Sequence, residues 1–184
     1  MPTAARTSAA AANTPRRIAR KRDGPCVAST CASRVRTNHM TGHKLVRFSQ
    51  AERDNLRRFG DAGGLLFSDD CNHDVNGLFA KSFEQEMQRT FPENPLAKLP
   101  STHAIYRSFF PFGSGPPQTS HELNGWGDNI VHDYLKGIER RGRLAVLYSN
   151  KDYGCEWDYD WRNKRFLRED NTKFAVNVVV YVMA

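Results

Sequence analysis

Hydrophobic positions between residues 49 and 67 predict a helix followed directly by a buried strand. Ser49-Gln50-Ala51-Glu52 is a capping box, in which the serine and the glutamate satisfy each other's backbone donors at a helix start. Leu56 and Phe59 share one face of that helix, and Gly63-Gly64 ends it. Leu65-Leu66-Phe67 is apolar on both faces and too short for a helix, as is typical of a buried parallel strand.

A second helix is predicted by Phe79, Phe83 and Met87, which recur every four residues and form one apolar stripe. We expect Asn76 to cap its start and Phe91-Pro92-Glu93-Asn94-Pro95 to end it. The stripe is assigned to the hydrophobic core.

The C-terminal half predicts further strands and one ambiguous segment. Residues 96–99 form a short strand, and residues 134–139 and 143–149 form a hairpin around Arg140-Arg141-Gly142. From Asn171 onward the density of β-branched residues favours a strand, whereas the spacing of the apolar residues also fits a helix. The pattern alone leaves both open.

Two loops interrupt these elements. Residues 111–129 are rich in Gly, Pro and Ser and have no periodicity, and loops of this length in compact domains are often functional. This loop carries His121, Glu122, Asn124 and Trp126. A second loop, residues 150–161, alternates aromatic and acidic side chains.

Charge divides the chain into a basic leader and a nearly neutral domain. Residues 1–47 hold ten Lys/Arg and one acid, and the remaining residues hold 17 Lys/Arg and 19 Asp/Glu, so the net charge of +7 is the sum of +9 and −2. We expect residues 1–39 to be a disordered leader and residues 40–184 to be the folded domain. Specific binding of nucleic acid by the domain is not expected.

Neither a transmembrane segment nor a secretion signal is recognisable, because the chain has no apolar run of about 18 residues and no apolar core follows its arginine pairs. A cytoplasmic location is the default expectation. No zinc-ribbon spacing or disulfide framework is indicated by the four cysteines, which are Cys26, Cys31, Cys71 and Cys155.

Several motifs occur in an order that resembles a known family. They are MTGH at residue 40, LRRFGDAGG, LLFSDDC, FEQEMQRTFP, LPSTHAIYRSFF, GRLAVLYSNKDYGCEW and the terminal NVVVYVMA. Residues 40–184 resemble the bacterial domain of unknown function 4159, which is similar to class I glutamine amidotransferase-like folds. The resemblance implies a flavodoxin-like α/β sandwich with a mostly parallel sheet and a helical last segment.

The chain departs from this family at its front. Family members open with a strand, a helix and a second strand before the Thr-Gly-His turn, and residues 1–38 contain no apolar run that could supply them. The sheet would then be incomplete at its N-terminal side. Our hypothesis is that residues 1–39 are not the native reading frame, which mass spectrometry of the natural protein can test.

Asp69-Asp70-Cys71 occupies the place of the nucleophile elbow in amidotransferase-like folds. A reactive thiolate needs a nearby cation or helix N-terminus, and the two adjacent carboxylates would instead raise the pKa of Cys71. The glycine-flanked elbow and a following His-x-Glu are also missing. A glutaminase is therefore not favoured, and the carboxylates are better catalytic candidates than the thiol.

The same turn could form a metal site of mixed oxygen and nitrogen ligands. Asp69, Asp70 and His73 are the candidate ligands and could activate water for hydrolysis. Histidines from other loops could join them: His43, His103 and His121. The structural alternative is that Asp70 caps the next turn and Asp69 pairs with an arginine such as Arg107.

Aromatic and acidic residues of the two loops could instead line a ligand cleft, in which rings stack on a sugar and carboxylates accept its hydroxyls. The candidate ligand-binding residues are His43, His103, Trp126, Asp152 and Trp157. The alternative is that Trp157 covers the sheet as an apolar lid.

The sequence favours a non-glutaminase domain that binds a small polar ligand or sugar. It does not identify a cofactor. The alternatives are a metal-assisted hydrolase using Asp69, Asp70 and His73, and a non-catalytic scaffold that docks onto a protein partner.

Overall fold

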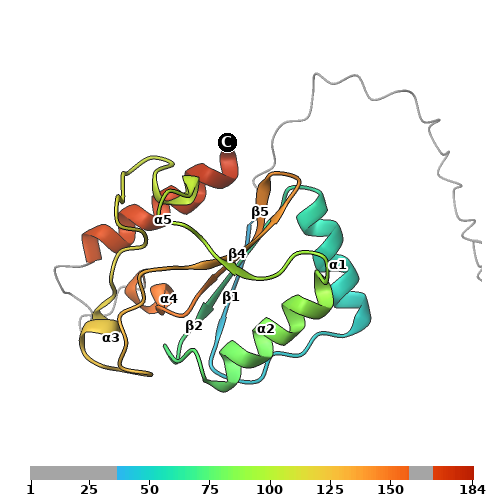
Figure 1. Ribbon diagram of the computed structural model, residues 1–184, viewed down its shortest axis with the longest axis horizontal. Helices are drawn as coiled ribbons and strands as arrows, with labels where there is room; N and C mark the ends of the chain where they lie inside the picture. The colour runs from blue at the N-terminus through green and yellow to red at the C-terminus, as the bar shows by residue number, and fades with distance from the viewer. Residues whose placement is uncertain (1–36, 158–167) are drawn as a thin grey trace, which may run out of the picture. The chain divides into compact units, whose positions relative to one another are not determined.

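The described chain forms an open five-stranded sheet with helices on both faces (Figure 1). This computed structural model describes residues 37–157 and 168–184. The predicted α/β class is confirmed. The first strand begins at Thr37, three residues before the domain start that we expected at residue 40. The rest of the basic leader lies outside the described residues.

The sheet is mixed. Across it, the strands follow the order β1 (Thr37–Gly42), β2 (Leu65–Asp70), β5 (Arg143–Ser149), β4 (Lys136–Arg140) and β3 (Ala97–Lys98). β1 pairs in parallel with β2, and β2 with β5, whereas β4 is antiparallel to both β5 and β3. The expected mostly parallel sheet is not confirmed, and the flavodoxin-like assignment stays a prediction.

A two-residue turn explains the antiparallel half of the sheet. Arg141 and Gly142 join β4 to β5 with positive φ angles of 53° and 77°. Two successive positive φ angles are what the tight hairpin turn of a right-twisted ribbon requires. The predicted hairpin is therefore confirmed, and so is the short strand within residues 96–99.

The helical elements are α1 (Gln50–Asp61), α2 (Leu78–Thr90), the 3-10 helix η1 (Ala104–Tyr106), α3 (Ser120–Leu123), α4 (Tyr153–Trp157) and α5 (Arg168–Met183). Ser49 and Glu52 form the predicted capping box at α1. Gly77, not Asn76, is the N-cap of α2, and the Asn76 backbone amide donates to Asp74 Oδ1 in the preceding turn.

The α1 and α2 helices cover one face of the sheet. The predicted stripe on α2, which includes Phe83 and Met87, packs on Leu66 and Val146 of the central strands. All four side chains are at most 5% exposed. The α2 stripe therefore belongs to the hydrophobic core, as the periodicity predicted.

The opposite face is covered by α5 and η1. Phe174 and Val178 of α5 pack on Phe67 and Leu147. The terminal segment is therefore a helix, as the family resemblance implied, and its β-branched residues are accommodated because tertiary packing outweighs intrinsic propensity. In the part of the chain that the structure describes, none of the helices has the length and apolar character needed to cross a membrane.

Candidate functional site at the carboxyl edge of the parallel strands

Polar side chains gather where the parallel strands end. β1, β2 and β5 end at Gly42, Asp70 and Ser149, on the same edge of the sheet. In open α/β sheets this edge is where ligands bind, because the loops that follow the strands can diverge and leave a crevice. The loops that follow β2 and β5 supply most of the side chains described below.

Asp69 is the most enclosed carboxylate at this edge. Its side chain is fully buried, and its Oδ2 accepts a hydrogen bond of 2.6 Å from the Gly154 amide. Its Oδ1 is buried without a hydrogen-bond partner. Burial raises the pKa of Asp69, although the hydrogen bond from the Gly154 amide acts in the opposite direction. Asp69 therefore holds an oxygen that the protein leaves unsatisfied, and it does not pair with Arg107.

Asp70 lies on the other face of the sheet. Neighbouring side chains of a strand alternate between faces, and Gly42, the residue opposite Asp70, faces Phe79 of α2. Asp70 Oδ1 accepts from the Asn72 amide at 2.9 Å, which forms the turn that the structural alternative predicted. The two carboxylates therefore lie on opposite faces of the sheet, and the metal site of Asp69, Asp70 and His73 stays a prediction.

Beside Asp69, a cluster of two thiols and a carboxylate is formed by Cys71, Asp152 and Cys155. One ligand atom from each of these residues lies within 4.8 Å of the others. Burial and then the charge of Asp69 raise the pKa of Asp152 to about 7. Burial, with Asp152 as a further cause, also raises the pKa of both thiols, that of Cys155 to about 12. Raised pKa values disfavour the reactive thiolate form of both cysteines.

His121 approaches this cluster from α3. Its Nδ1 lies 3.2 Å from Asp152 Oδ2 and 3.7 Å from Glu156 Oε1. The Trp126 ring packs on the imidazole, with the ring centroids 5.0 Å apart. Sequence analysis placed His121 among the possible partners of Asp69 and Asp70, and the structure brings it to Asp152 instead.

His73 belongs to a second, buried cluster with Asp128 and His132. His132 Nε2 lies 2.9 Å from Asp128 Oδ2. The two ring nitrogens of His73 face backbone carbonyls, Nδ1 that of Asn150 at 2.5 Å and Nε2 that of Ile130 at 2.9 Å. Both ring nitrogens of His73 therefore lie at hydrogen-bonding distance from backbone carbonyls of other loops. These contacts connect three loops, so the cluster has a structural role.

A buried ion pair fixes the loops above the edge. Lys151 Nζ donates to Glu122 Oε1 and to the carbonyl of His132, both at 2.5 Å, and the side chains of Lys151 and Glu122 are fully buried. Burial lowers the pKa of Lys151, although the negative charge of Glu122 acts to raise it. In the same region, the Ser120 amide donates to Glu156 Oε1 at 2.7 Å. The long loop is thus anchored to the segment that follows β5.

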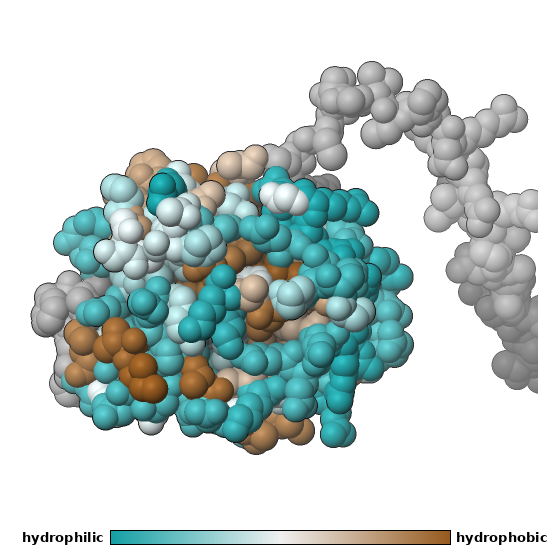
Figure 2. Space-filling view, in the orientation of Figure 1, coloured by the Kyte–Doolittle hydropathy of each residue, from teal (hydrophilic) through white to brown (hydrophobic). Residues whose placement is uncertain are grey.

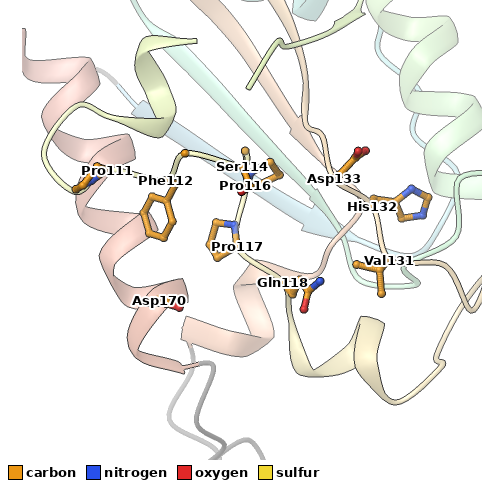
Figure 3. A pocket seen from close by; sticks show the side chains of 12 residues that line it. Pro111, Phe112, Ser114, Pro116, Pro117, Gln118, Val131, His132, Asp133 and Asp170 are labelled. Atoms are coloured by element: carbon orange, nitrogen blue, oxygen red, sulfur yellow. The ribbon is translucent and has the colours of Figure 1, made fainter. Parts of the chain in front are cut away.

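A pocket of about 440 Å³ lies within these loops (Figure 3). Residues 111–118 form most of its wall, and residues 131–133 and Asp170 complete it. Figure 3 shows the Pro117 ring between Phe112 and Gln118, and the His132 ring directed away from the prolines. His132 therefore lines the pocket chiefly through its backbone, and its imidazole is directed toward Asp128.

Comparison with known families completes this description. A family model described as a domain of unknown function, DUF4159, matches residues 8–183. The chain belongs to this family. No curated protein matches it. The match confirms the resemblance drawn from residues 40–184, and it begins earlier, within the basic leader. The class I glutamine amidotransferase-like relationship of this DUF4159 domain stays a prediction.

Other predicted ligand-binding residues of the DUF4159 domain lie apart from the cluster of Cys71, Asp152 and Cys155. His43 is exposed, and its carbonyl accepts from Asn72. His103 caps η1 and contacts Glu139 Oε1 at 3.2 Å. The Trp157 indole donates to the Asn171 carbonyl and packs on Phe67, so it is the apolar lid of the alternative interpretation. Residues 158–161 of the second loop lie outside the described residues.

Sequence reasoning missed Asp128, His132, Lys151 and Cys155 as members of these clusters. Asp128 and His132 are four residues apart, which is a weak signal in a segment without helical periodicity. The spacing of three between Asp152 and Cys155, combined with the position of Cys71 after a strand, was a readable signal, because residues that follow neighbouring parallel strands meet at one edge.

Proposed function

We propose that this DUF4159 domain binds a small polyhydroxylated ligand, such as a sugar, in the pocket formed by residues 111–118, residues 131–133 and Asp170. The observation that carries the proposal is the pocket itself, whose volume of about 440 Å³ is within the range of small-molecule sites. Most of its wall comes from the long Gly- and Pro-rich loop, and loops of this length in compact domains are often functional.

The pocket walls are held in place before any ligand binds. The Pro117 carbonyl accepts from the Tyr153 hydroxyl at 2.5 Å, and the Phe112 amide donates to the Tyr106 carbonyl at 2.8 Å. The Asn177 amide group donates to the Phe110 carbonyl, and its Oδ1 accepts from the Phe110 amide. A preformed wall reduces the entropy that binding would otherwise cost.

The chemistry of the lining selects the ligand class. The lining includes two acidic residues, Asp133 and Asp170, two neutral polar residues, Ser114 and Gln118, and the aromatic residue Phe112. Carboxylates accept hydrogen bonds from hydroxyl groups and disfavour anions, whereas a ring can stack on the apolar face of a sugar. A neutral polyol therefore fits better than a phosphorylated ligand.

A panel of neutral sugars, with their phosphorylated counterparts as a negative set, tests the proposal by thermal shift and calorimetry. A ligand present at 100 times its Kd should stabilise the protein by about 2.7 kcal/mol. Asp133→Asn should weaken binding at least tenfold, and Asp54→Asn, on α1, is the matched control that should not. Absence of binding by the whole neutral panel would remove the proposal.

The cysteines are not needed for this function. Burial raises the pKa of the Cys71 thiol, although the contact between its Sγ and Thr41 Oγ1, 2.8 Å apart, acts in the opposite direction. Because a glutaminase needs a thiolate, this supports a non-glutaminase role. A Cys71→Ser variant should retain ligand binding within a factor of two.

A second candidate function is a non-catalytic interaction domain. Large apolar side chains in the long loop and directly after it are exposed: Leu123 by 48%, Trp126 by 60%, Ile130 by 51% and Val131 by 42%. Figure 2 shows hydrophobic patches over the region that contains α3 in Figure 1. If this surface mediates self-association, analytical ultracentrifugation should show a concentration-dependent oligomer that Trp126→Ser dissociates. A monomer at all concentrations would exclude that form of interaction.

A further inference from the structure

The cluster of Cys71, Asp152 and Cys155 has no part in the proposed ligand pocket. Cys71 directly follows β2, Asp152 follows β5, and Cys155 lies in α4. The three side chains thus come from two neighbouring parallel strands and meet at the edge of the sheet. One sulfur or oxygen atom of each lies within 4.8 Å of those of the other two.

Unsatisfied oxygens point to a missing partner at this place. Asp152 is 3% exposed, and its Oδ1 is buried without a hydrogen-bond partner. Asp69, which is fully buried next to it, also leaves Oδ1 without a partner. A buried carboxylate oxygen that accepts no hydrogen bond is energetically unfavourable. A bound cation would remove this cost, whereas an anion or a neutral apolar group would not.

The donor atoms select the kind of cation. Two cysteine sulfurs and one carboxylate oxygen form a soft and mixed donor set, which zinc accepts and magnesium or calcium does not. In a tetrahedral zinc site with bonds of about 2.3 Å, neighbouring sulfurs lie roughly 3.8 Å apart. The observed separation limit of 4.8 Å therefore requires small side-chain shifts at most.

Further contacts orient two of the donors. Thr41 Oγ1 lies 2.8 Å from Cys71 Sγ, and His121 Nδ1 lies 3.2 Å from Asp152 Oδ2. Polar neighbours of this kind fix the orientation of metal ligands and raise metal affinity. Asp152 Oδ2 lies near His121, and one carboxylate oxygen of Asp152 lies within 4.8 Å of both sulfurs.

We propose that Cys71, Asp152 and Cys155 bind one thiophilic divalent cation of the zinc class, with a water molecule as the fourth ligand. On binding, two metal–sulfur bonds and one metal–oxygen bond form, and the two thiol protons are released to solvent. The bound cation would link the ends of β2 and β5 to α4. It is independent of the sugar pocket, so either proposal can fail while the other stands.

Metal binding to the full chain tests this inference. Chelator-treated, reduced protein is titrated with zinc by calorimetry and with cobalt by absorption spectroscopy, in which thiolate ligands give sulfur-to-cobalt charge-transfer bands. We expect one equivalent to bind with those bands, and Cys71→Ser, Cys155→Ser and Asp152→Asn each to lose at least 100-fold in affinity. The matched control is the double variant Cys26→Ser and Cys31→Ser, which changes the other two thiols and should bind as the wild type does.

Several outcomes would overturn the inference. They are the absence of zinc binding, binding that survives in Cys71→Ser and Cys155→Ser, loss of binding in the double control variant, and loss of binding in His132→Gln with retention in Cys155→Ser. Circular dichroism and thermal unfolding of the metal-free variants establish that they fold. A variant that is folded without metal but does not bind it supports the site, and the stability gained from zinc by the wild type provides a second readout.

Discussion

Among the glycines that the structure describes, Gly127 is the one at which an added methyl group should lower the free energy of unfolding most. Its φ is +69°, and a Cβ at this position would lie 1.9 Å from the His73 carbonyl oxygen. The neighbouring Asp128 amide donates to that same carbonyl at 2.9 Å, so the backbone cannot move away without breaking the contact. We predict that Gly127→Ala lowers the free energy of unfolding by about 3 kcal/mol or more.

Gly63 provides the matched control for this prediction. Its φ is +82°, but a Cβ there would have no heavy atom within 4 Å. Gly63→Ala should therefore cost only the conformational strain of a left-handed residue, about 1 kcal/mol. Urea unfolding of both variants measures the difference. Equal losses would show that the close approach to His73 is not a constraint in solution.

At the same scale, the sequence places Asp69, Asp70 and Cys71 at the end of a buried strand, and this is confirmed. It does not indicate how long the strand is. Because the strand continues through Asp70, the two carboxylates alternate between faces, and only Asp69 reaches Asp152. The partners of each acid depend on loops far away in the chain, which a local pattern cannot specify.

At the scale of the elements, Glu86 joins α2 to α1. It is 2% exposed and accepts from Arg53 Nη1 at 2.9 Å and from Arg89 Nη1 at 2.6 Å. Burial acts to raise the pKa of Glu86, but the hydrogen bonds from the two arginines outweigh it and leave the pKa below its ordinary value of 4.5. A carboxylate with a lowered pKa in the folded state stabilises the protein above the unfolded-state pKa, and this contribution is lost as the pH falls through the folded-state pKa.

We predict that Glu86→Gln lowers the free energy of unfolding by about 1–3 kcal/mol at pH 7, and that the difference from wild type shrinks below about pH 4. Glu84→Gln is the control on the same helix, because Glu84 is 41% exposed in its ion pair with Lys136 and should cost below about 1 kcal/mol. Urea unfolding at pH 7 and pH 3.5 gives both values. A difference that is the same at the two pH values would contradict the assignment.

Elements with a strong periodic signal were predicted, and those without one were not. The α2 stripe and the β4–β5 hairpin each repeat an apolar pattern over several residues. β1 has the exposed and half-buried sequence TNHMTG, because it is an edge strand, and it could not be distinguished from the leader. The four-residue helix α3 rests on the Thr119 and Glu122 capping box and is too short to show a period.

For the molecule as a whole, the position of the loops at the carboxyl edge depends on the ion pair between Lys151 and Glu122. Both side chains are fully buried, and Lys151 also donates to the His132 carbonyl, beside the pocket. Removing one member leaves the other charge buried without its partner, which typically costs 3–5 kcal/mol. Replacing both with neutral groups of similar volume should cost much less.

We therefore predict that Lys151→Met destabilises the protein by about 3 kcal/mol or more, and that the double variant Lys151→Met, Glu122→Gln recovers part of this loss. Hydrogen exchange should rise first across residues 112–133, while β2 and β5 stay protected, because the pair holds the loops and not the sheet. Ligand binding by the pocket should weaken in the same variants. If exchange rose equally in the strands, the pair would be part of the global core, and the pocket loops would not be a separate unit anchored to the sheet.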